Sequence, residues 1–119
     1  MDITTTTDGT FARITPCGDI DLDTLFPLRA AAAALPARVT DLQWDLAHTS
    51  FMDVAGLHLL FDPTPPGGPD RRTTVTGLRR QPLRLLLLAA DTHPAAFALD
   101  RLLSGTTPTE LHRAAPGRR

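Results

Sequence analysis

Histidine, cysteine and serine are the residue types in this chain that could support catalysis or bind a metal. His58 and Asp62 stand four residues apart, a spacing that places two ligands on one helix face, but no third ligand is apparent. Cys17 has no histidine at a recognisable spacing, and Ser50 lacks the glycine-flanked turn of a hydrolase nucleophile. Gly67-Gly68 is followed by no Lys-Ser or Lys-Thr pair, which excludes a P-loop. We therefore expect a protein that is not an enzyme and that holds no metal and no cofactor.

Asp53 is the polar residue whose position predicts most, because it lies where a strand pattern gives way to a helix pattern. Polar and apolar residues alternate over 41–46, which predicts a strand with one buried face, and the apolar spacing after Asp53 predicts a helix. The Asp53 carboxylate can accept hydrogen bonds from the free amides of the first helical turn. Asp53 is thus either a helix cap alone or a cap that also belongs to a contact surface.

Three strands are expected in the first half of the chain. β-Branched residues favour a strand over 3–7, a second strand follows over 11–15, and Asp8-Gly9 between them is a favourable hairpin turn. The third strand is expected over 39–47. The large apolar residues expected in the core on or near this strand are Leu42, Trp44, Leu46, Phe51 and Met52.

Two helices are expected to flank the third strand. The first covers 25–35, with Thr24 as its cap and Pro27 in its first turn, where the missing amide hydrogen costs little. A stripe at helical spacing predicts its buried side: Leu25, Leu28, Ala32 and Leu35. The second helix opens at Asp53 and is ended by Pro63.

The second half of the chain predicts one more strand, over 72–76, after a Pro/Gly-rich loop over 62–70. Leu and Ala over 83–90 favour a helix with Pro82 at its first position, and a buried strand is the alternative. A last helix is expected over 94–103.

The order of these elements predicts the organisation of the whole chain. We expect a single domain over 1–112 and a disordered basic tail over 113–119. Strands that alternate with helices predict an α/β fold, in which helices cover one or both faces of a sheet.

Composition restricts the location of the protein and its partners. The net charge of -1 over 119 residues gives no reason to expect nucleic acid or an anionic membrane as a partner. A single cysteine fits a reducing compartment, and the polar segment 1–10 predicts no signal peptide. The longest apolar runs are too short to span a bilayer. We therefore expect a cytoplasmic protein.

Five arginines form a cluster in the second half of the sequence: Arg71, Arg72, Arg79, Arg80 and Arg84. Such a cluster is most often a solvated face, and a docking site for an acidic partner is the alternative. Nucleic-acid binding is less favoured, because aromatic residues that could stack on bases are lacking around the cluster.

Two segments of the chain carry a resemblance to a known family. The first is Gly18-Asp19-Ile20-Asp21, and the second runs from Asp45-Leu46 through Phe51-Met52-Asp53-Val54-Ala55-Gly56-Leu57. They resemble the signature of the STAS family, the bacterial anti-sigma factor antagonists. The first is similar to the family's G-E-[IL]-D turn before its first helix, and the second to the pattern D-L-x-x-x-x-F-[IM]-D-S-[AST]-G-L. A weaker echo is Thr74-Val75-Thr76-Gly77-Leu78. The resemblance covers about residues 10–90 and implies a small mixed sheet with helices packed mainly on one face.

Val54 stands where the family has the serine that is phosphorylated by an anti-sigma factor of the kinase type. Valine has no hydroxyl, so the resemblance implies a variant that is not phosphorylated at this position. Gly56 is expected to let a partner's backbone approach the helix start closely. The resemblance implies that the partner is bound by Gly18, Asp19, Asp21, Asp53, Val54, Ala55, Gly56 and Leu57.

The function that the resemblance implies is regulation of transcription by protein binding. The chain would sequester a kinase-type anti-sigma factor and so release a sigma factor. Pro63 ends the helix after Asp53 earlier than in the family, which weakens the implied contact surface. The alternative is a non-catalytic scaffold module that assembles with other STAS proteins or with a signalling complex.

Overall fold

The computed structural model describes residues 1–61 and 71–93. A mixed sheet has the strand order β1-β2-β3-β4, where the strands are β1 (Asp2–Asp8), β2 (Phe11–Cys17), β3 (Asp41–Asp45) and β4 (Arg72–Thr76). The helices of the described part are α1 (Leu22–Ala33), α2 (Val54–Phe61) and α3 (Arg80–Thr92). β1 pairs with β2 antiparallel, whereas β2, β3 and β4 run parallel to one another. The expected α/β class with a mixed sheet is confirmed.

The hairpin of β1 and β2 turns at Gly9-Thr10, one residue later than the predicted Asp8-Gly9, because Asp8 still pairs with Phe11. Gly9 has a φ of 61°, a conformation that glycine adopts without the steric penalty of a side chain. Both strands extend beyond the predicted bounds, because their pairing continues from Asp8 opposite Phe11 to Asp2 opposite Cys17. β1 is an edge strand that is exposed along most of its length.

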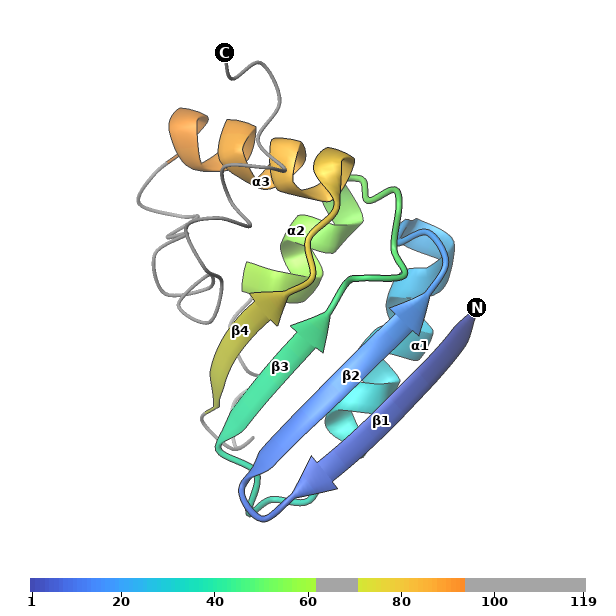
Figure 1. Cartoon of the computed structure of the whole chain (residues 1–119), viewed down its shortest axis with the longest axis vertical. Helices are drawn as coiled ribbons and strands as arrows, with labels where there is room; N and C mark the ends of the chain where they lie inside the picture. Colours follow the sequence, from blue (N-terminus) through green and yellow to red (C-terminus); the bar gives the residue numbers. More distant parts are fainter. Residues whose placement is uncertain (62–70, 94–119) are drawn as a thin grey trace.

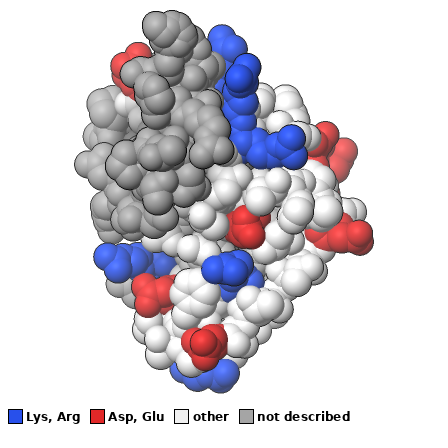
Figure 2. Space-filling model, in the orientation of Figure 1, with Lys and Arg blue, Asp and Glu red and all other residues white. Residues whose placement is uncertain are grey.

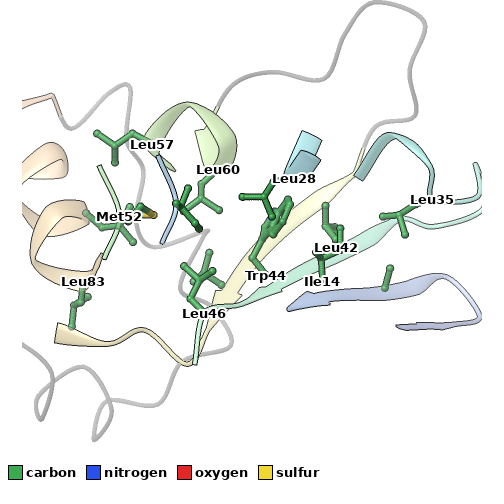
Figure 3. Close-up of a cluster of buried hydrophobic side chains, with 14 of the residues drawn as sticks. Ile14, Leu28, Leu35, Leu42, Trp44, Leu46, Met52, Leu57, Leu60 and Leu83 are labelled. Atoms are coloured by element: carbon green, nitrogen blue, oxygen red, sulfur yellow. The ribbon is translucent and has the colours of Figure 1, made fainter. Parts of the chain in front are cut away.

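The core lies on one face of the sheet, where α1 and α2 cover the strands (Figure 1). Leu42, Trp44 and Leu46 are all buried, which confirms the buried face predicted from the alternation of residues in this strand. Trp44 and Ile14 face Leu28 of α1 across the core (Figure 3). The opposite face of the sheet carries polar side chains such as Arg13 and Gln43, which share a hydrogen bond of 2.8 Å.

α1 begins three residues earlier than expected, and Asp21 is its cap instead of Thr24. The Asp21 carboxylate accepts from the Thr24 amide at 3.1 Å, and the Thr24 hydroxyl accepts from the Asp21 amide at 2.9 Å. This reciprocal pair is a capping box. Because the helix starts at Leu22, Pro27 lies beyond the first turn, where proline removes a helical hydrogen bond. The prediction that Pro27 belongs to the first turn was therefore wrong.

Segment 83–90 is part of helix α3. The helix that its sequence favoured is therefore confirmed, and the alternative of a buried strand is wrong. Leu83 and Leu86, three residues apart, are buried, while Arg84 between them is exposed, as in an amphipathic helix. Arg79 is the cap residue of this helix, and its backbone carbonyl accepts from the Leu83 amide. Pro82 therefore occupies the third helical position and not the first. Unbranched leucines favour a helix once one of its faces can be buried.

The predicted loop over 62–70, the helix over 94–103 and the tail over 113–119 lie outside the described residues. The boundary at residue 112 lies there as well. Among the helices of residues 1–61 and 71–93, none has the length and apolar character needed to cross a membrane.

Candidate functional site

A short parallel bridge between Ile20 and Met52 joins the two segments that the sequence singled out. The Ile20 amide donates to the Phe51 carbonyl at 3.0 Å, and the Asp53 amide donates to the Ile20 carbonyl at 3.1 Å. α1 and α2 start two residues after the bridge, at Leu22 and Val54. Their amino-terminal ends therefore lie side by side, at the carboxyl end of the parallel strands (Figure 1).

Aspartates cap both of these helices. Asp53 accepts from the Ala55 amide at 2.8 Å through its carboxylate, which confirms the cap predicted from the sequence. Asp21 has the same role in α1. The two helix starts carry a positive dipole end and free amides, which would attract an anion. The carboxylates of Asp21 and Asp53 already supply negative charge at these helix starts. The chain's own side chains therefore balance the positive ends of the two helix dipoles.

Large apolar side chains are exposed around the two helix starts. Leu22 and Val54, the first residues of α1 and α2, are 76% and 59% exposed. Phe26, one turn further along α1, is 80% exposed, and Phe51 beside the bridge is 44% exposed. We call these four residues the docking surface. Phe51 was expected in the core, and that prediction was wrong, because its neighbour Met52 is the residue that turns inward and is fully buried.

Three residues of the expected contact set face the interior instead. Ala55, Gly56 and Leu57 are buried beneath the start of α2. A Cβ atom on Gly56 would overlap the Cγ and Sδ atoms of Met52. Gly56 thus makes room for the Met52 side chain. Val54 is the residue of this turn that offers an apolar side chain to a partner.

The Gly56–Met52 contact predicts a change of sign between two backgrounds. Gly56→Ala is expected to lower the free energy of unfolding by about 1–2 kcal/mol, because a buried side chain must move to make room. In a Met52→Ala background the same change should raise stability by about 0.5–1 kcal/mol, the advantage of alanine over glycine in a helix. Urea unfolding of the four proteins measures both effects. An equal loss in both backgrounds would show that Met52 is not the obstacle.

The first loop of the site turns at Gly18, whose φ of 131° is one that side chains rarely allow. Its amide donates to the His48 carbonyl at 3.1 Å, which ties this loop to the segment that follows β3. Asp19 is exposed beside it. Asp21 is half-buried because it is engaged in the cap of α1. Of the two acidic residues in this turn, Asp19 is therefore the one that is open to a partner.

Gln81, which the sequence analysis did not single out, holds the other side of Met52. Its carboxamide oxygen accepts from the Met52 amide at 2.8 Å, and its carboxamide nitrogen donates to the Met52 carbonyl at 2.9 Å. The Met52 backbone is thus bonded as it would be by a neighbouring strand. The two residues are 29 positions apart, and no sequence spacing pairs a glutamine with a backbone segment at that distance.

The arginines that are clustered in the sequence have different environments in the structure. Arg71 is half-buried and donates to four backbone carbonyls around the end of α1, so the expectation of a solvated face was wrong for this residue. Arg79 and Arg80 are exposed at the start of α3. Because Gln81 is bonded to Met52, the chain segment that carries these two arginines lies next to the Met52 segment.

Groups that could bind a metal are not found in the described part of the chain. No three His, Cys, Asp or Glu side chains come together within residues 1–61 and 71–93. Cys17 is an exposed free thiol at the end of β2.

Several solved chains are similar to this one in fold. One of them is the anti-sigma factor antagonist SpoIIAA in its unphosphorylated form, with a TM-score of 0.44 and 18% identity, over 79% of this chain and 99% of that chain. No family model matches this sequence, and no curated protein matches it either.

Proposed function

We propose that this chain is a non-catalytic protein-binding module of the anti-sigma factor antagonist type. The exposed apolar side chains around the two helix starts are the observation that supports the proposal most directly. Large apolar side chains that are exposed together on a protein surface commonly mark an interaction site. The motif resemblance at Gly18–Asp21 and Asp45–Leu57 supplies the class of partner, an anti-sigma factor of the kinase type.

Val54 gives the proposed module its regulatory property. A serine at the first position of α2 would offer a hydroxyl at the centre of the docking surface, and phosphate there would add a charge of roughly −1.5 to −2. Val54 is exposed but has no hydroxyl. The proposed module therefore stays in its binding form in the presence of a kinase, because the covalent off-switch is missing.

Binding is tested with purified anti-sigma factors of the kinase type from the source organism, by calorimetry against the full chain. Val54→Asp is expected to weaken binding about tenfold or more, because a charge replaces an apolar contact at the centre of an interface. Ala37→Asp is the matched control, since Ala37 is exposed in the turn after α1, away from the two helix starts. With ATP present, a kinase partner should add phosphate to a Val54→Ser variant and leave residue 54 of the wild type unmodified.

Two results would contradict the proposal. Wild-type protein that binds none of the purified anti-sigma factors would exclude the partner class. Binding that is weakened equally by Val54→Asp and Ala37→Asp would exclude the docking surface as the contact.

A further inference from the structure

Three chain segments lie in one row across the docking surface. The segment at Ile20 is bonded to one side of the Met52 segment through the bridge. Gln81 at the start of α3 is bonded to the other side of Met52. The order across the surface is therefore the start of α1, the start of α2, and the start of α3.

The charges along this row change sign from one end to the other. Asp19 and Asp23, at the α1 end, are exposed. Arg79 and Arg80, at the α3 end, are also exposed. In the upper right of Figure 2, acidic side chains lie along the edge of the molecule, and basic side chains lie above them toward α3. The apolar side chains of Phe51 and Val54 belong to the middle segment.

The row carries exposed acidic side chains together with Leu22 and Phe26 at the α1 end, apolar side chains in the middle, and exposed basic side chains at the α3 end. The charges of such a row are complementary to those of a second copy. Rotation by 180° about an axis that passes through the middle of the row and is perpendicular to it places the acidic end of one copy against the basic end of the other. Both charge contacts then form at once, and the two apolar centres meet. A two-fold axis along the row would instead bring charges of equal sign together, which costs binding free energy.

We propose that the docking surface also binds a second copy of this chain, as a two-fold dimer in which Asp19 and Asp23 face Arg79 and Arg80 of the other copy. The dimer covers Phe51 and Val54. Self-association and the binding of another protein at this surface are therefore mutually exclusive. This inference goes beyond the proposed function and does not depend on it, because it concerns the purified chain alone.

Sedimentation equilibrium of the full chain tests the dimer. At low salt the wild type is expected to reach twice the monomer mass of 12.8 kDa as its concentration rises. High salt should weaken the association, because the charged ends are screened. Two double variants reverse the charge at one end each: Asp19→Arg/Asp23→Arg and Arg79→Asp/Arg80→Asp. The affinity of self-association should fall about tenfold or more in each, since both ends of the row then carry charges of the same sign.

Mixing the two variants gives the decisive result. Each variant retains one native end and carries one reversed end, so a mixed dimer has two attractive contacts and should form with near wild-type affinity. Recovery on mixing also shows that both variants are folded. Asp8→Arg, on the exposed end of β1, is the control for a charge reversal elsewhere and should leave the dimer intact.

Three results would overturn the inference. A wild type that stays monomeric at about millimolar concentration does not self-associate through any surface. Dimers unchanged by both charge-reversal variants would use another face. Variants that lose association separately and do not recover it together would exclude the two-fold arrangement. Calorimetry with the anti-sigma factors is a separate measurement, so failure of the proposed function is distinguishable from failure of the dimer.

Discussion

Replacement of Arg71 by methionine is expected to lower the free energy of unfolding by about 2–4 kcal/mol, because several carbonyls lose a charged donor at once. The guanidinium donates to the Pro36 carbonyl at 2.9 Å and to the Val39 carbonyl at 3.0 Å. Two longer bonds of 3.4 Å reach the carbonyls of Ala32 and Leu35. A cation at the carboxyl end of a helix also interacts favourably with the helix dipole.

Arg72→Met is the matched control for this prediction, because Arg72 is exposed on β4 next to Arg71. The control is expected to change stability by at most about 0.5 kcal/mol, as is usual for exposed positions. Chemical denaturation of both variants measures the difference. Arg71→Lys should fall between the wild type and Arg71→Met, since one ammonium group cannot reach four carbonyls in the way that a planar guanidinium does. Equal stability of the Arg71→Met and Arg72→Met proteins would rule out that Arg71 stabilises the fold through the carbonyls around the end of α1.

Gln81→Ala is expected to cost about 2–4 kcal/mol of folding stability, because the amide and the carbonyl of Met52 both lose their partner. The Met52 side chain is fully buried, and its backbone forms the middle of the row on which the docking surface is built. The substitution should also increase the rate of hydrogen exchange at the Met52 amide selectively. Binding of any partner at the docking surface should weaken with it, since Phe51 and Val54 would no longer be held in place.

Gln81→Glu separates the two hydrogen bonds. A carboxylate still accepts from the Met52 amide but cannot donate to the Met52 carbonyl, so we expect a loss smaller than that of Gln81→Ala. Arg84→Ala, at an exposed position of the same helix, should leave both stability and Met52 exchange unchanged. If exchange rises equally over the whole chain in Gln81→Ala, the bond contributes to global stability and not to the position of the docking surface.

Local patterns predicted the elements whose structure depends on neighbouring residues. β4 has the predicted bounds, and the hairpin turns within one residue of the predicted Asp8-Gly9. Asp53 caps α2, because a carboxylate one residue before a helix reaches its first amides wherever that helix lies. The cap of α1 was placed three residues too late, since Asp21 and Thr24 are both good capping residues and the sequence does not rank them.

Residues whose role depends on distant neighbours could not be assigned in this way. Phe51 and Met52 are adjacent and both apolar, yet one is exposed and the other is buried, because only Met52 points toward Gly56. Arg71 and Arg72 are identical in type, yet only Arg71 reaches the end of α1. The sequence contains no signal that distinguishes the members of either pair.

The sequence by itself determined the α/β class, the presence of the four strands and of the first two helices of the described residues, and the cap of α2. These features follow from the periodicity of side chains along the chain and from hydrogen bonds between near neighbours. The tertiary structure alone decided which side chains form the docking surface and which residues hold it. The Ile20–Met52 bridge, the Gln81 contacts and the Arg71 contacts join residues that are about 30 positions or more apart. Contacts of this kind depend on how the elements pack in space, and the one-dimensional pattern of the chain does not contain that packing.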